Sequence, residues 1–181
     1  MNVDKEAFQR GVQLDHLGIV LVMWASMAPT DYFGFYCSPR LQSAYIVLAT
    51  LSALGCAVFT LRPQFRTPAF RTSRSIMFAL LGVSAFVPVL HGVVSNGWRL
   101  QNQRMAVSYF IGLGLLNGMG TVIYASRVPE RWYPRRFDIF GASHQIMHVL
   151  VAMGAFSQGR GLVKALEYWH GKRESGDVCG A

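Results

Sequence analysis

Long apolar stretches alternate with short, mostly basic segments along this chain of 181 residues. Because the hydrocarbon core of a bilayer is about 30 Å thick, an α-helix that crosses it needs roughly 20 mainly apolar residues. Five windows of about that length carry little or no charge, and we predict that they form membrane-crossing helices. They cover about residues 12–36, 41–61, 75–95, 105–126 and 139–158. The pattern predicts an all-α integral membrane protein folded as a helical bundle.

The five windows differ in the polar residues that they contain. The first is the least apolar because it holds Asp15 and Asp31, whereas the second has no charged residue. The third contains Pro88, and we expect a kink there, since neighbouring groups in a membrane bundle can bond the freed carbonyl. The fourth contains "GLLNG" (114–118), whose G-x-x-x-G spacing lets another helix approach closely. We favour packing within the bundle over a dimer interface for this motif.

Composition supports a membrane protein, because 52% of the residues are hydrophobic, 14% are charged and the mean hydropathy is +0.29. We predict a single bundle domain over residues 1–170. Within it, "GLVKALEYWH" (161–170) is expected to form a short helix at the membrane surface. Residues 171–181 are expected to form a disordered tail.

The formal net charge of +8 bears on orientation. Ten of the Lys and Arg residues fall on the side of the N-terminus and seven on the other side, and positive residues in short loops tend to stay cytoplasmic. We therefore predict a cytoplasmic N-terminus and an extracellular or lumenal C-terminus, in the plasma membrane or the endoplasmic reticulum. Nucleic-acid binding is not expected, since no soluble basic face with a reading module is present.

Two histidines lie four residues apart in the last window. His144 and His148 should project from one face of a helix, one turn apart. Ionisable groups in membrane segments are costly and usually line a site or pathway. The spacing fits two ligands of a metal such as zinc, which needs three or four; alternatively, each histidine is a polar contact between helices. Asp15 and His144 both fall in the inner leaflet and could converge. His91 falls near the outer face and is expected to be an interfacial or packing residue outside the site.

Four stretches carry a family resemblance: "QLDHLGIVLVMWASMAPTDYFGFYCSP", "FRTPAFRTSR", "VPVLHG" and "RVPERWYPRRFDIFGASHQIMHVLV". They resemble the progestin and adipoQ receptor family. This family includes adiponectin receptors, fungal relatives linked to zinc homeostasis and the more distant haemolysin III-type proteins. The resemblance runs from Leu14 to about His170, is closest to fungal members, and is most specific in P-E-R, F-D-I and S-H-Q-I-x-H.

The resemblance implies a seven-helix membrane protein with zinc in the inner leaflet. His144 and His148 would be two zinc ligands, and Asp15 of L-D-H would orient the zinc-bound water. It further implies a ceramidase-like reaction, in which zinc acidifies water to cleave the amide of a ceramide-type lipid. Gln145 stands where the metalloprotease H-E-x-x-H motif has its glutamate. The alternative is a non-enzymatic receptor or regulator with a structural metal and a cytoplasmic protein partner at the basic loops 62–74 and 127–136.

This chain departs from the family at its beginning. The family's third histidine ligand lies on its second helix, whereas "MNVDKEAFQRG" leads directly into the third. The five windows would then correspond to helices three to seven. We expect the site to be incomplete here and to hold zinc more weakly. Whether the sequence is a fragment or a natural short form stays open.

Overall fold

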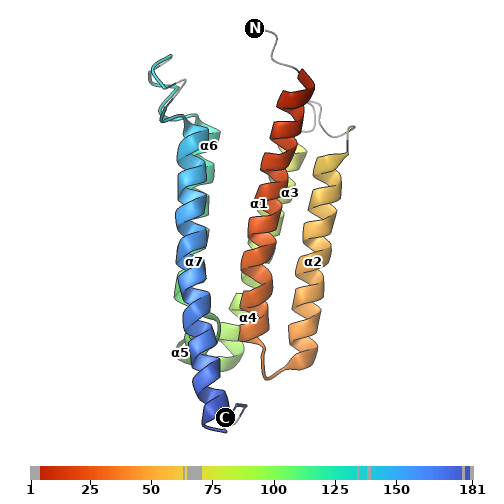
Figure 1. Ribbon diagram of the computed structural model, residues 1–181, viewed down its shortest axis with the longest axis vertical. Helices are drawn as coiled ribbons and strands as arrows, with labels where there is room; N and C mark the ends of the chain where they lie inside the picture. Colours follow the sequence, from red (N-terminus) through yellow and green to blue (C-terminus); the bar gives the residue numbers. More distant parts are fainter. Residues whose placement is uncertain are drawn as a thin grey trace. The chain divides into compact units, whose positions relative to one another are not determined.

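The computed structural model describes residues 5–62, 64, 71–133, 135–137, 140–176 and 178–179. In these residues every regular element is a helix, as the sequence predicts. The chain forms two compact units, Met1–Gly97 and Trp98–Ala181, which are described separately. A single domain over residues 1–170 therefore stays a prediction. The helices, in chain order in Figure 1, are α1 (Lys5–Gly34), α2 (Pro39–Leu61), α3 (Arg71–Ser84), α4 (Phe86–Asn96), α5 (Trp98–Met105), α6 (Val107–Ser126) and α7 (Ser143–Glu174).

In the first unit, α1 and α2 run antiparallel and pack side by side (Figure 1). Small residues make this possible, since Ala49, Ala53 and Cys56 are buried along one stripe of α2 and small side chains allow close approach of membrane helices. The indole of Trp24 on α1 donates a 3.0 Å hydrogen bond to the Thr50 hydroxyl on α2.

The predicted kink in the third window is a break between α3 and α4. Helix α3 ends at Ser84 and α4 begins at Phe86, two residues before Pro88. A proline ring clashes with the carbonyl four residues earlier, which is that of Ser84, and proline has no N–H to bond it. The helical hydrogen-bond ladder is therefore interrupted at Ala85, and Pro88 lies in the first turn of the next helix, where it is tolerated.

In the second unit, glycines let α6 and α7 approach closely. A Cβ on Gly120 would lie 3.3 Å from Met147, and one on Gly154 would lie 3.1 Å from the Leu113 side chain. Gly118 of the "GLLNG" motif has nothing within 4 Å of the corresponding position. The glycine-rich window thus packs within the bundle, as favoured above, but through Gly120 rather than through Gly118.

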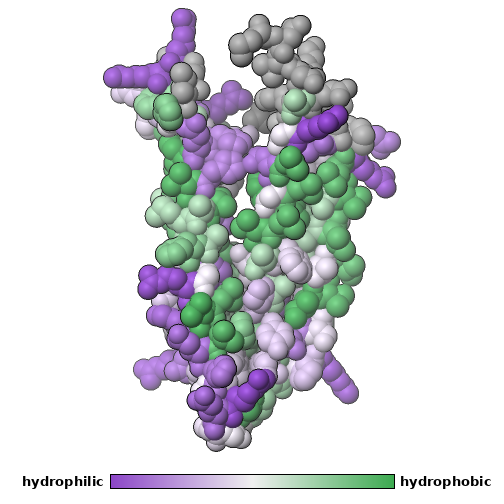
Figure 2. Space-filling model, viewed as in Figure 1, coloured by the Kyte–Doolittle hydropathy of each residue, from purple (hydrophilic) through white to green (hydrophobic). Residues whose placement is uncertain are grey.

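Each of the five predicted windows contains a helix, and among the described residues four helical segments are long and apolar enough to cross a membrane. They are Pro39–Leu61, Ile76–Asn96, Val107–Ser126 and Ser143–Glu174. Helix α1 is not among them, so its crossing stays a prediction. Large apolar side chains on these segments point outward, for example Val122 at 67% and Phe156 at 71% exposure. Figure 2 shows such hydrophobic residues along the middle of the helices of each unit, with hydrophilic residues toward their ends.

The last helix is longer than predicted. Residues 140–142 are not helical, and α7 runs without a break from Ser143 to Glu174. The predictions of a separate surface helix over residues 161–170 and of disorder in residues 171–174 are therefore wrong. Packing explains the extension: Trp169 is only 5% exposed, and its indole donates a 3.2 Å hydrogen bond to the Arg104 carbonyl on α5. Such contacts hold the helix beyond the length that hydropathy alone suggests.

Candidate metal centre

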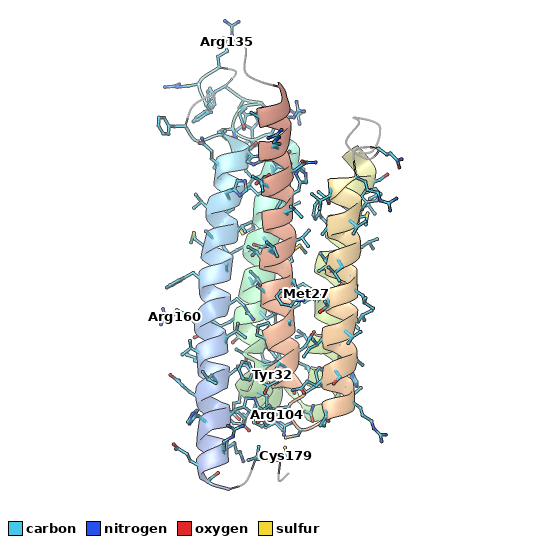
Figure 3. All side chains as sticks on the ribbon, turned by 45° about the vertical axis from the view of Figure 1, so that its right-hand side comes forward. Met27, Tyr32, Arg104, Arg135, Arg160 and Cys179 are labelled. Carbon is cyan, nitrogen blue, oxygen red and sulfur yellow. The ribbon has the colours of Figure 1, made fainter. Side chains whose placement is uncertain are left out.

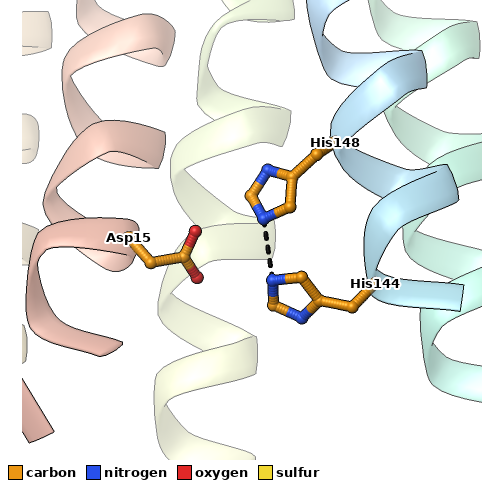
Figure 4. A group of neighbouring side chains, drawn as sticks. All are labelled: Asp15, His144 and His148. Carbon is orange, nitrogen blue, oxygen red and sulfur yellow. Dashed lines mark hydrogen bonds between the residues drawn. The ribbon is translucent and has the colours of Figure 1, made fainter. Parts of the chain in front are cut away.

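The predicted histidine pair forms at the start of α7. The Nε2 atoms of His144 and His148 lie 2.7 Å apart within hydrogen-bonding distance, shown by the dashed line in Figure 4. The ring of Tyr124 on α6 stands edge-on to His144, with ring centroids 5.3 Å apart. His144 is exposed and His148 partly exposed. The helical spacing therefore brings both imidazoles to one accessible spot, as expected.

The geometry of the pair fits two positions of a tetrahedral zinc. In the hydrogen bond, one ring must carry a proton on Nε2 and the other must accept it; a metal would replace that proton. Zinc–nitrogen distances of about 2.0–2.1 Å at a tetrahedral angle separate two ligand atoms by roughly 3.3 Å. The rings would need to part by about 0.6 Å from their 2.7 Å separation, which small side-chain rotations provide. The remaining ligands must come from other groups.

A glutamate outside the helix caps the turn that carries His144. Ala142 occupies the N-cap position of α7 and offers no capping side chain. Instead, Oε1 of Glu130 accepts hydrogen bonds from the backbone N–H of Ser143, at 2.7 Å, and from its hydroxyl, at 2.9 Å. A carboxylate at a helix N-terminus satisfies an unbonded N–H and complements the helix dipole.

These contacts also set the charge of Glu130. Burial raises the pKa of its carboxyl. Hydrogen bonds from its own backbone and from Ser143, together with the Arg127 guanidinium, lower the pKa by more than burial raises it, so the pKa lies below its ordinary value. The carboxyl is therefore ionised at neutral pH and remains an acceptor for Ser143. The P-E-R motif thereby acquires a structural role in fixing the first turn of α7.

Gln145, which directly follows His144, has a similar anchoring role. Its Oε1 accepts a 2.7 Å hydrogen bond from the backbone N–H of Gly141. Gly141 has φ of +80°, which favours glycine, and a Cβ there would lie 3.0 Å from the Phe137 ring. Sequence reasoning missed these roles of Glu130, Ser143 and Gln145. The available signal was Ala142, which stands at the N-cap position but has no capping side chain. This signal does not identify the distant side chain that caps the helix instead.

The other candidate residues belong to the first unit. Asp15 lies on α1 and is partly exposed; its role in orienting water stays a prediction. His91 lies on α4, where its Nδ1 is 2.7 Å from the Tyr45 hydroxyl and its ring centroid is 5.6 Å from that of Phe35. The expectation that His91 serves packing is thus confirmed.

The apolar helices define a multi-pass integral membrane protein of the helical-bundle class. Comparison with known families narrows this class: the family described as haemolysin-III related matches residues 2–159. The chain belongs to this family, and the family resemblance inferred from its motifs is confirmed; the expected closeness to fungal members stays a prediction.

Individual relatives agree with this assignment. An adiponectin receptor protein of Drosophila melanogaster is 37% identical over 156 residues, which cover 86% of this chain and 35% of the relative. The heptahelical transmembrane protein ADIPOR3 of rice is 38% identical over 146 residues, 81% of this chain and 36% of the relative. The ADIPOR-like receptor IZH2 of Saccharomyces cerevisiae is 30% identical over 168 residues, 93% of this chain and 53% of the relative. The chain thus spans between about a third and about half of the length of these relatives.

Proposed function

We propose that this chain provides part of a zinc site in an adiponectin-receptor-like membrane protein, and that the site hydrolyses the amide bond of a ceramide-type lipid. The observation that carries the proposal is the accessible His144–His148 pair, with its Nε2 atoms 2.7 Å apart. When bound, zinc would supply a Lewis acid and a water of lowered pKa. The site would lie in the inner leaflet, with the N-terminus cytoplasmic and the C-terminus extracellular or lumenal.

Each side chain has a distinct role in this proposal. His144 and His148 would bind the metal through Nε2, and the Glu130–Ser143 hydrogen bonds would hold the first turn of α7 in place. We assign to Asp15 the role of accepting a proton from the attacking water, because a carboxylate can act as such a base. Gln145 cannot do so, since an amide is not a base and its oxygen already accepts the Gly141 N–H. The family resemblance implies a third histidine ligand in addition to these two.

The zinc content of the purified, detergent-solubilised chain tests the metal site directly. We expect zinc to be retained by the parent and lost in His144→Ala and in His148→Ala. His170→Ala is the matched control, because this histidine lies on the same helix with a side chain that is 69% exposed, and its Nδ1 lies 3.8 Å from the Glu174 carboxylate. A His144→Ala or His148→Ala variant that keeps as much zinc as the parent would contradict the proposal.

A non-enzymatic receptor is the second candidate, favoured by the fact that two of the relatives are receptors by name. In that case, the metal would be structural and the basic loops would contact a cytoplasmic partner. Asp15→Asn separates the two functions: if the site hydrolyses ceramide, this variant should keep its zinc but lose fatty-acid release. Fatty-acid release that is unchanged in Asp15→Asn would count against the proposed role of Asp15.

A further inference from the structure

A pocket lies in the second unit, on α5, α6 and α7, and its lining residues do not include the histidine pair. Its volume is about 560 Å³. The residues around it include the Asn102 amide, the Lys164 ammonium and the hydroxyls of Ser108, Tyr109, Ser157 and Tyr168. None of the described residues that line it is acidic. The pocket therefore combines one positive charge with several hydrogen-bond donors, which favours an anionic occupant.

Two contacts fix the groups that would meet this anion. The Lys164 Nζ lies 5.0 Å from the centre of the Tyr109 ring, a cation–π arrangement that leaves the ammonium able to donate outward. The Oδ1 of Asn102 accepts a 2.8 Å hydrogen bond from the Ser108 backbone N–H. The amide NH₂ group of Asn102 is thereby turned away from this bond and remains available as a donor.

The position of the pocket along the helices matches the level of lipid headgroups. Ser108 and Tyr109 lie in the first turn of α6, where the apolar segment begins. Lys164 lies 20 residues after His144 on α7, a rise of about 30 Å, which is the thickness of the hydrocarbon core. Tyrosines and lysines at such depths are typical of the membrane interface.

Apolar side chains continue from the pocket toward the middle of the helices. Ile111 and Leu115 follow Ser108 at helical spacing on α6 and are 36% and 64% exposed. Met153 precedes Ser157 by one turn on α7 and is 53% exposed. A ligand with both a charged head and an apolar tail would therefore find a matching surface for each part.

We propose that this pocket binds the phosphate-containing headgroup of an anionic phospholipid, with Lys164 as its charge partner and the acyl chains against α6 and α7. The proposal is independent of the metal centre, because it uses none of the residues assigned to zinc. An inorganic phosphate ion would share the charge recognition but not the apolar contacts. The two sources can therefore be separated by experiment.

The test uses the full chain, delipidated in detergent and titrated with dioctanoyl phosphatidylglycerol, with bound lipid counted by native mass spectrometry. We expect Lys164→Met to weaken binding about fivefold, since one lysine near a lipid surface contributes about 1 kcal/mol. Lys164→Arg should preserve binding. Arg160→Gln is the control for charge alone, because Arg160 is exposed on the same helix (labelled in Figure 3) and does not line the pocket. Dioctanoylglycerol, which lacks the phosphate, should bind more weakly than the phospholipid.

Three outcomes would overturn the proposal. Equal lipid binding by Lys164→Met and the parent would show that Lys164 is not the charge partner of the phosphate. An equal loss in Arg160→Gln would show that overall charge, and not the pocket, attracts the lipid. Displacement of the phospholipid by an equal concentration of inorganic phosphate would identify a small-anion site instead of a lipid site. Far-ultraviolet circular dichroism of each variant verifies that the helices are retained.

Discussion

Gly161 provides the sharpest test of the packing between α6 and α7. A Cβ at this position would lie 2.6 Å from the Cβ of Tyr109, 2.9 Å from its Cγ and 3.0 Å from the Cβ of Ala106. These atoms are attached to or near the backbone of α6, so no flexible side-chain end can move aside. Gly161→Ala should therefore force the two helices apart. Gly159, two residues earlier on the same helix, has nothing within 4 Å of the corresponding position.

The magnitude follows from two opposing terms. Alanine is more favourable than glycine inside a helix by roughly 0.5–1 kcal/mol, and Gly159→Ala should stabilise the protein by about that amount. At Gly161 the same gain is opposed by an overpacking cost of about 1–3 kcal/mol, so the net effect should be a loss of roughly 1 kcal/mol. The two variants should then differ by about 2 kcal/mol, or about 4–8 °C in Tm for a chain of this size.

Thermal unfolding in one detergent, followed by circular dichroism, measures this difference. The paired design matters because both variants add one methyl group to the same helix, and only the surroundings differ. Equal melting temperatures for the two variants would refute the close approach of α6 and α7 at Gly161. A lower melting temperature for Gly159→Ala would refute the open surroundings assigned to that residue.

Two further predictions concern the helix ends. Because the pKa of Glu130 is lowered in the folded protein, its hydrogen bonds to Ser143 should stabilise the fold above the ordinary glutamate pKa. This stabilisation should be lost as the pH falls through the pKa of the folded state, so the Tm difference between the parent and Glu130→Gln should vanish in that acidic range. A Tm difference that stays constant with pH would contradict this. Pro88→Ala should let α3 and α4 join into one helix, which would lengthen the distance between spin labels at the exposed Ile76 and Val94; an unchanged distance would contradict it.

The sequence predicted the helices well where hydropathy and helix ends coincide, and less well where tertiary contacts decide. The uncharged window at residues 41–61 became α2 within two residues, because its apolar run ends at Arg62. The C-terminal extension was missed because its stabilising contact, the Trp169 indole on the Arg104 carbonyl, joins residues 65 positions apart.

The candidate site was likewise predictable only in part. The i and i+4 spacing of His144 and His148 fixed their shared face, since helical geometry alone determines it. The cap by Glu130 was not predictable, because a carboxylate thirteen residues before a helix can reach its end only if the intervening loop folds back. Nothing in the local pattern specifies that path.

Because α7 is one continuous helix, its two ends are expected to move together. It contains no proline over its 32 residues, so it behaves as a stiff rod about 48 Å long. His144 and Lys164 are 20 residues apart, which places them about 200° apart around the axis. A twist of the rod would therefore carry the imidazoles and the ammonium in nearly opposite directions. A rigid-body shift of α7 at one end would likewise move its other end.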